Sequence, residues 1–299
     1  MRESHLEDPP MTTVNSVAPS LSPKQNPRDG WHADEADAAR PPESRLFSYP
    51  RFGDKYSEPS ITTPKAFAEV PLETVPHTAV LCFTKFLDAA VDQVLAAHPD
   101  SRESKVVPDL HFLSSSVALV RNKSLLGAPM ATVQLERLIQ LGIRSFIILG
   151  IAGSLREGTD IGQIVVCDRA VRDEGTSHHY LPSSEYAWPA PEVPARLTTF
   201  LRERGIDVQV GGTWTTDAIF RETALEVRRL AAEGILTVEM EAAALFSVAR
   251  FRGVQLGAVF AISDLVHRES WERGQDGSAL ANSLSRVLPH LVQFKPDAD

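Results

Sequence analysis

Cysteine is nearly absent from this sequence, with Cys82 and Cys167 as the two thiols among 299 residues. They lie far apart, each inside an apolar run, and form neither a CxxC pair nor another metal-binding pattern. This spacing argues against the disulfide framework of a small secreted domain and predicts buried thiols in a reducing compartment. We therefore expect a cytoplasmic protein that binds no metal.

Long hydrophobic runs and an excess of positive charge are also lacking. No run of about 18 apolar residues occurs, so no membrane-spanning helix is predicted. The first ten residues are acidic and have no apolar core, so we expect no secretory signal there. The formal net charge is −9, which argues against a nucleic-acid partner, although a locally positive pocket can still hold a small anion. The 43% hydrophobic and 23% charged content is that of an ordinary soluble globular protein.

The chain divides by composition into three parts. Residues 1–45 are rich in proline, serine and charged residues and have few large apolar ones, so they cannot offset the entropy of ordering, and we predict a disordered tail. Residues 46–71 carry aromatics among prolines and charges, which indicates either an extended arm or more of the tail. Residues 72–299 show no linker and no internal repeat, and they are predicted to form one domain.

Short apolar runs alternate with segments of helical periodicity in this domain, which predicts an α/β fold: a central mixed sheet flanked by helices. Strands are expected over 78–83, 109–115, 117–120, 146–149, 164–167, 208–210, 211–215 and 255–262. Helices are expected over 86–97, 131–141, 191–204, 222–233, 241–250 and 279–288.

The most unusual stretch is Thr237 to Phe246, where Glu239, Met240 and Glu241 lead directly into small and apolar residues. Carboxylates at a helix entrance are stabilised by the free N–H groups and the helix dipole. An ionised carboxylate only accepts hydrogen bonds, which suits the two neighbouring hydroxyls of a sugar. The alternative is that acidic residues simply favour the first turn of a helix.

Polar or small residues follow several predicted strands, and ligands of α/β sheets bind at the carboxyl ends of strands. We predict a small-residue loop over 150–154, in which Gly150 and Gly153 present main-chain N–H groups to an anion; a tight turn is the alternative. The segment from Arg172 to Tyr180 contains Thr176 and His179 and could stack on a planar base, or it could be a surface loop. Its paired histidines lack metal-ligand spacing.

An aspartate, Asp264, ends the apolar strand predicted over 255–262 and follows Ser263. Partial burial there raises the pKa of a carboxyl and allows it to give a proton, although capping of the next turn is an equal alternative. Asp217, which follows the strand predicted over 211–215, is expected to cap a helix.

Together these stretches resemble the nucleoside phosphorylase family, which includes the uridine phosphorylases, the hexameric purine nucleoside phosphorylases and the methylthioadenosine nucleosidases. The resemblance covers about residues 75–295. The segment 238–244 is similar to the family's ribose-binding signature, and Gly127-Ala128-Pro129 before a helix also fits the family. The segments 162–166 and 170–177 are similar to the strand and base-side loop of uridine phosphorylases. Ser263-Asp264 is similar to the corresponding pair in the purine-acting members.

The resemblance implies roles for these residues. Met240 and Glu241, with Glu239, would hold the ribose, and Asp264 would be the general acid at the base. Tyr180, Arg172, Thr176, His179 and Ser263 would lie on the base side. Gly127, Gly150 and Gly153 would border the anion, and inorganic phosphate would be a co-substrate with no other cofactor. A dimer-based homo-oligomer is also implied.

The sequence departs from the family at the phosphate site. The family's Gly-Asp-Pro loop is replaced by residues 82–86, and Ile148 and Ile151 stand where an arginine and a threonine contact phosphate. We therefore expect cleavage of a nucleoside N-glycosidic bond, most directly by phosphorolysis. Hydrolysis by a nucleosidase and binding without turnover are the alternatives, and the base can be a purine or a pyrimidine.

Overall fold

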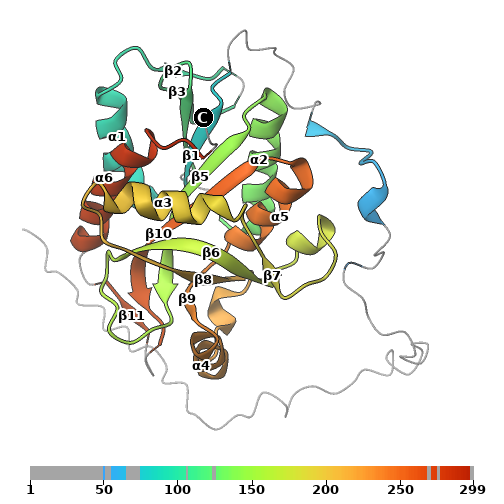
Figure 1. Cartoon of the computed structure of the whole chain (residues 1–299), viewed down its shortest axis with the longest axis vertical. Coiled ribbons are helices and arrows are strands. Elements are labelled where there is room, and N and C mark those ends of the chain that lie inside the picture. Colours follow the sequence, from blue (N-terminus) through green and yellow to red (C-terminus); the bar gives the residue numbers. More distant parts are fainter. Residues whose placement is uncertain are drawn as a thin grey trace, which may run out of the picture. The chain divides into compact units, whose positions relative to one another are not determined.

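The computed structural model describes residues 50, 55–64, 75–105, 107–122, 126–267, 271–274 and 277–296. The predicted disordered tail, 1–45, lies outside these residues, as does much of the predicted arm. Figure 1 shows strands in the middle and helices around them. The α/β fold predicted from the sequence is confirmed.

The described strands form one sheet of 11 in the order β11-β10-β6-β8-β9-β5-β1-β4-β3-β2, with β7 paired to β6. Their bounds are β1 Thr78–Cys82, β2 Arg102–Glu103, β3 Leu110–Phe112, β4 Val117–Arg121, β5 Ser145–Ser154, β6 Ile164–Asp173, β7 Tyr186–Ala187, β8 Val208–Thr216, β9 Ile235–Glu239, β10 Gln255–Leu265 and β11 Glu272–Arg273. Because β10 pairs with both β6 and β5, the strands β5, β10, β6, β8 and β9 form a closed ring. The strands β1 to β4 extend from this ring beyond β5.

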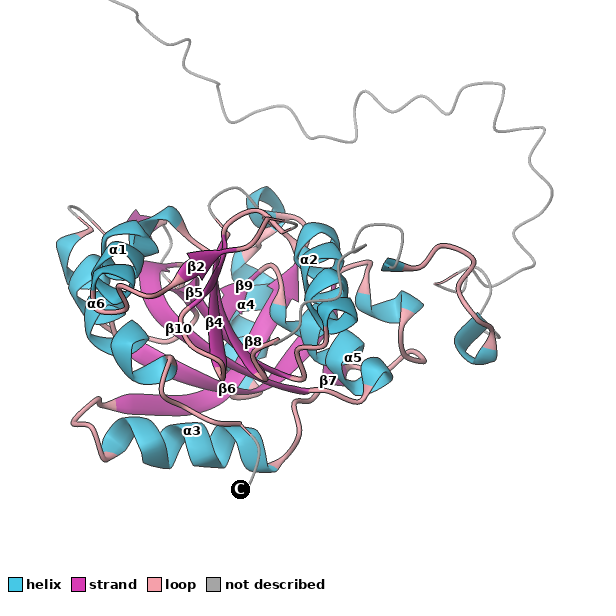
Figure 2. Ribbon diagram, turned by 90° about the horizontal axis from the view of Figure 1, so that it is seen from above, coloured by secondary structure: helices cyan, strands magenta, loops and turns pink. Residues whose placement is uncertain are grey.

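Helices cover both faces of the sheet (Figure 2). Their bounds are α1 Asp88–Ala96, α2 Ala128–Leu141, α3 Glu192–Arg202, α4 Ala224–Ala232, α5 Ala242–Arg252 and α6 Ser278–Leu291. One apolar core lies among α1, α3 and α6, and the other lies under α2 and α5. None of the described helices is long and apolar enough to cross a membrane.

The helix ends follow from the sequence. Helix α2 begins after Gly127 with proline in its first turn and ends at Gly142, whose φ of 112° lies in the left-handed region that glycine favours. Helix α4 begins at Thr223, which forms a capping box with Glu226. The expected helix cap at Asp217 is wrong, because its Oδ2 accepts a hydrogen bond from the Gly175 N–H (2.8 Å) instead.

Three strands continue beyond their predicted ends. Strand β5 runs through Ser154, so the loop predicted over 150–154 is wrong. Strand β6 likewise includes Arg172 and Asp173, and β10 includes Asp264. Small or polar residues favour loops, but neighbouring strands supply backbone partners here that override this preference.

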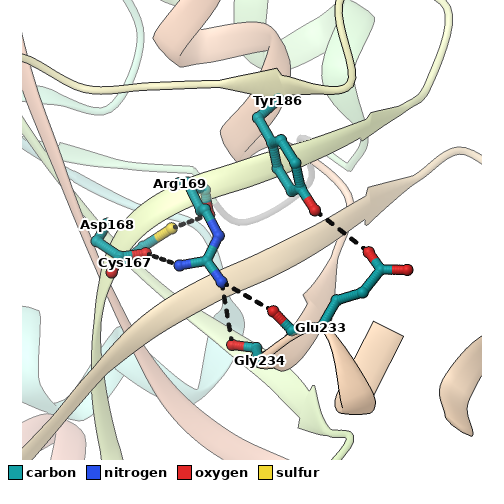
Figure 3. Close-up of polar contacts among 6 residues, drawn as sticks. All are labelled: Cys167, Asp168, Arg169, Tyr186, Glu233 and Gly234. Carbon is teal, nitrogen blue, oxygen red and sulfur yellow. Dashed lines mark hydrogen bonds and ion pairs between the residues drawn. The ribbon is translucent and has the colours of Figure 1, made fainter. Parts of the chain in front are cut away.

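A bulge in β6 helps to fix α4 (Figure 3). The register between β6 and β8 shifts between Cys167 and Arg169, and the Cys167 Sγ donates to the Arg169 carbonyl (3.1 Å). The Arg169 guanidinium pairs with Asp168 (3.0 Å) and donates to the Glu233 carbonyl (3.2 Å) just beyond α4. A cation at a helix C-terminus is favourable, so this contact holds α4 against the sheet beside β9.

Both cysteines are buried free thiols, as expected. Burial raises the pKa of Cys82 to about 12 and raises that of Cys167 as well.

Candidate active site

The candidate site lies where three strands of the ring end together. Gly153 of β5 pairs with Val238 of β9 on one side and with Asp264 of β10 on the other. Neighbouring strands lie about 4.8 Å apart, so Asp264 and Val238 are separated by roughly 10 Å. Glu239 follows Val238 directly, which brings the Glu239–Glu241 segment and Asp264 to the same end of the ring.

After Glu239 the chain leaves the sheet, close to the place where β1 and β9 pair with different parts of β5. Among the described pairings, β1 contacts the first half of β5, up to Leu149, and β9 contacts Gly153 and Ser154. The residues 150–152 of β5 lie between these two pairings. Helix α5 starts at Ala242, opposite this opening, with Glu241 at its N-cap position.

Glu239 uses both carboxylate oxygens within the protein. Its Oε2 accepts from the N–H groups of Glu241 and Ala242 (both 2.7 Å), and its Oε1 accepts from Thr215 Oγ1 (2.5 Å). Thr215 Oγ1 in turn accepts from the Ala243 N–H (3.0 Å), so this network satisfies three N–H groups of the first turn of α5. Glu239 thereby holds the first turn of α5 on β8.

Glu241 joins α5 to α2. Its Oε1 accepts a hydrogen bond from the Gly127 N–H (2.7 Å), at the residue that precedes α2. Gly127 therefore lies beside the glutamate cluster, and its expected place beside an anion stays a prediction. Met240 is half-buried between the two glutamates.

Burial controls the charge of these two carboxyls. It raises the pKa of Glu239 to about 8, with the negative charge of Glu241 as the second cause. It also raises the pKa of Glu241 to about 7, against the stabilising N–H groups of Gly127 and Met240. Burial and the mutual repulsion of like charges thus raise the pKa values of the pair, against the N–H donors that favour the ionised forms.

Asp264 occupies a tightly fitted position. Ser263 Oγ donates to its Oδ1 (2.5 Å), and Trp271 Nε1 donates to its Oδ2 (2.8 Å). A side-chain carbon at Gly153 would lie 3.1 Å from Asp264 Oδ2, so glycine leaves the room that the carboxylate needs. The register between β10 and β5 shifts by one residue at Ser263, which is the extra residue of a bulge.

Arg172 is engaged within its own loop, in contrast to its expected contact with a base. Its Nε donates to Ser177 Oγ (2.9 Å), and its two terminal nitrogens contact the Leu181 and Pro182 carbonyls, Ser184 Oγ and the His178 ring at 2.7–3.4 Å. These contacts use all five guanidinium donors. Arg172 thus shapes the loop, and burial lowers its pKa; a contact with a base stays a prediction.

The rest of that loop faces the arm and α5. The Thr176 N–H donates to Glu174 Oε2 (2.5 Å), the exposed His179 contacts Lys55 Nζ (2.9 Å), and the Tyr180 ring packs on Phe251 with centroids 5.5 Å apart. Burial and the nearby Glu136 carboxylate raise the pKa of Tyr180.

The contact with Glu136 places Tyr180 at a distance from the glutamate cluster, Glu239–Glu241. Glu136 lies eight residues along α2 from Ala128, which at 1.5 Å per residue is about 12 Å. The structure thus brings together Gly127, Gly153, Glu239–Glu241 and Ser263–Asp264, whereas Tyr180 lies further along α2.

The expected anion site is largely apolar. Ile148 is buried in the core, and Gly150 and Gly153 belong to a strand, so their prediction as an anion-binding loop is wrong. Arg121 at the end of β4 is held by Asp92 and lies 3.9 Å from Asp88, both on α1. These carboxylates offset its positive charge.

Sequence reasoning missed two residues at the Asp264 end of the site. Trp271 was not singled out, because nothing in its neighbourhood marks a tryptophan as a partner of Asp264. The sequence predicts Glu222 as the start of a helix, but it ends the short turn after β8, and burial and the charge of Asp264 raise its pKa. The exposed Phe220 lies in the same turn. The capping residues Thr223 and Glu226 could have shown that the helix starts later.

Comparison with known proteins identifies the family of this chain. The family model of the phosphorylase superfamily matches residues 65–293. Guanosine phosphorylase from Halorubrum lacusprofundi is 31% identical over 182 residues, which are 58% of this chain and 70% of that protein. Uridine phosphorylase from Haemophilus influenzae is 26% identical over 161 residues, 49% of this chain and 63% of that protein, so the match spans less than two thirds of its length. The structure of purine nucleoside phosphorylase from Toxoplasma gondii superposes with a TM-score of 0.62 and 18% identity, over 74% of this chain and 92% of that one.

The chain belongs to the phosphorylase superfamily. The family resemblance stated from the sequence is confirmed, and the family indicates an enzyme of the pentosyltransferase class. The structural neighbour supports the fold alone.

Proposed function

We propose that this protein cleaves the N-glycosidic bond of a purine nucleoside by phosphorolysis. The observation that carries the proposal is the pairing of two carboxyl centres across one strand: Gly153 of β5 lies between Val238, next to Glu239, and Asp264. A nucleoside has its hydroxyls at one end and its base at the other, which matches this separation.

The two ends of the site suit the two ends of a nucleoside. Glu241, fixed by Gly127 at the start of α2, is positioned to accept hydrogen bonds from the 2′ and 3′ hydroxyls, with Met240 against the sugar. Glu239 holds this segment in place through α5. Asp264 and Ser263 meet the base at the other end, and the exposed Phe220 offers an aromatic face for it.

This arrangement favours charge separation in the transition state. As the bond from C1′ to the base nitrogen lengthens, positive charge develops on the sugar and negative charge on the base. Carboxylate character at Glu241 stabilises the sugar charge, and a proton or hydrogen bond at the Asp264 end stabilises the base. Phosphate then bonds to C1′, and the products are the free base and the sugar 1-phosphate.

Hydrolysis is the second candidate, and the apolar anion region favours it. Ile148 is buried and Arg121 is offset by two acidic residues, so neither is arranged as a ready phosphate contact. In this case water would take the place of phosphate and yield the free sugar. The curated relatives are named as phosphorylases, which supports phosphorolysis as the first proposal.

One assay separates these functions. Base release is measured from guanosine, inosine, adenosine and uridine, each with and without inorganic phosphate. Release that requires phosphate supports phosphorolysis, and release without it supports hydrolysis. If no base is released while nucleoside binding persists, the protein is a binder; Asp264→Asn would then leave affinity unchanged. A cytoplasmic location and a dimer-based homo-oligomer stay predictions.

A further inference from the structure

A second cavity lies between the arm segment 55–64 and the helices α2 and α5, and we call it the arm cavity. Its volume is about 450 Å³, which is within the range of small-molecule sites, about 300–1,000 Å³. Helix α5 starts next to Glu241, and nine residues separate its first residue from Phe251 at the arm cavity. At 1.5 Å per residue this is about 14 Å along the helix, so the arm cavity is separate from the candidate active site.

The floor of the arm cavity is held together by side chains of α2, α5 and the loop that precedes β7. Glu136 is buried and accepts from Arg252 on both carboxylate oxygens (2.8–3.0 Å) and from the Tyr180 hydroxyl. The Tyr180 ring meets Phe251 edge-on, and the Arg252 guanidinium lies 5.0 Å from the Phe251 ring centroid. These contacts tie three elements together, so the floor is preformed.

The Thr132 hydroxyl of α2 is the unusual polar group at this cavity. Thr132 lines the cavity and is 5% exposed, and its Oγ1 makes no hydrogen bond within the part of the chain that the structure describes. A buried hydroxyl without a partner is costly. A helical threonine can satisfy its hydroxyl on the carbonyl four residues earlier, as Thr198 of α3 does with Pro194 (2.7 Å). The Thr132 hydroxyl is therefore available to a bound molecule.

The charges around the arm cavity favour an anion. Arg252 is balanced by Glu136, as described above. Of the other described residues that line the cavity, Lys55 and Arg137 are basic and Glu58 is acidic. One net positive charge remains, and it attracts a negatively charged group.

Aromatic side chains lie beside these cations. Phe251, which is 39% exposed, and Tyr56 of the arm both line the cavity. The Tyr56 hydroxyl donates to the His178 carbonyl (2.9 Å), which fixes this ring against the domain. Aromatic rings pack well on other flat rings. A ligand that joins a flat ring to an anionic group uses both features of the cavity, whereas a neutral ring or a sugar phosphate uses one.

We propose that the arm cavity binds a small molecule in which an aromatic ring is joined to an anionic group, of the size of a nucleoside monophosphate. Lys55 and Arg137 attract the anionic group, Thr132 donates a hydrogen bond, and Phe251 and Tyr56 pack on the ring. This binding goes beyond the proposed cleavage of nucleosides and needs no turnover.

The test measures binding of guanosine monophosphate to the full-length protein by isothermal titration calorimetry in a buffer without phosphate. Ribose 5-phosphate carries the anionic group without the ring and should bind at least about 10-fold more weakly. Thr132→Val replaces the hydroxyl by a methyl group of similar shape and should weaken binding of guanosine monophosphate about 5-fold. Its Tm should not fall, because the protein loses no hydrogen bond, and Thr132→Ser should restore the affinity.

Two variants serve as controls for the location of the ligand. Thr198→Val removes a hydroxyl that is bonded within α3, and Glu241→Gln alters the candidate active site. Both should bind guanosine monophosphate as the wild type does. Lys55→Gln, in contrast, should weaken binding about 5-fold, and this difference should shrink at high salt.

Three results would overturn the inference. The first is no detectable binding of guanosine monophosphate by the wild type at about 1 mM. The second is equal affinity in Thr132→Val and the wild type. The third is a loss of affinity in Glu241→Gln but not in Thr132→Val, which would place the ligand in the candidate active site. A wild type that is inactive on every nucleoside would overturn the proposed function but not this inference.

Discussion

Removal of the Glu239 carboxylate should destabilise the protein severely. Glu239→Ala leaves three buried donors without their acceptor: the N–H groups of Glu241 and Ala242 and the hydroxyl of Thr215. Each unsatisfied buried donor costs about 1–3 kcal/mol. Relief of the buried charge and entry of water offset part of this cost, so we expect a net loss of about 3–5 kcal/mol.

Thermal unfolding measures this loss directly. For a domain of this size the expected loss corresponds to a fall in Tm of roughly 10 °C. Glu239→Gln retains one oxygen for the two backbone N–H groups and should lose only about 1 kcal/mol. Glu241→Gln is the comparison at the other glutamate and should reduce activity far more than stability. An unchanged Tm in Glu239→Ala would refute the positioning role assigned to Glu239.

The same pair makes a prediction about pH. Because burial raises the pKa of Glu239 to about 8 and that of Glu241 to about 7 from an ordinary 4.5, the folded state holds protons more tightly than the unfolded state. Their stabilising contribution is fully present below pH 4.5 and is lost as pH rises through 7 to 8. Tm should therefore decline as the pH rises from about 4.5 to about 8. The decline should be shallower in Glu239→Gln, which has no proton to lose.

Three further outcomes are expected. Gly153→Ala places a carbon 3.1 Å from Asp264 Oδ2, so the carboxylate must move. The value of kcat/KM should then fall about 10-fold or more, and the protein should lose about 1–3 kcal/mol of stability. Unchanged kinetics would contradict the tight fit. Cys82, whose pKa burial raises to about 12, and Cys167 should react with a thiol reagent at pH 8 only after unfolding, as followed by absorbance. Tyr56→Phe removes the hydroxyl that donates to the His178 carbonyl (2.9 Å) and should increase protease cleavage within 55–64; equal cleavage would show that this bond does not hold the arm.

The sequence predicts the helices α1 to α6 because helical periodicity and glycine stops are strong local signals, but it does not predict strand β9, which leads into the site. Helix α2 with Gly142 and α5 behind Glu241 are examples. The predicted ends of β5, β6 and β10 were less accurate, because glycine and polar residues are tolerated in a strand where neighbouring strands supply its hydrogen bonds. Such pairing is a tertiary property and leaves no local signal.

The candidate site likewise combines residues with a local signal in the sequence and residues that only the fold brings together. The acidic segment at 239–241 and Asp264 stand out locally, and the structure brings them together. The role of Arg172 within its loop could not be predicted, because its partners lie up to twelve residues further along the chain and meet it only in the folded loop. Glu222 and Trp271 approach Asp264 from other elements, and no spacing in the sequence links them to it.

The bulge at Ser263 has a consequence for how this site can change in evolution. Side chains two positions apart on a regular strand point to the same side, so if Ser263 were paired regularly, without the register shift, Asp264 would share the orientation of the buried Ile262. With it, Ile262 and Asp264 pair with the adjacent residues Ala152 and Gly153 and therefore point to opposite sides. Loss of the Ser263 codon would keep the carboxyl on its side but remove the hydroxyl that donates to it, whereas loss of the register shift with Ser263 retained would turn the carboxyl to the side of Ile262.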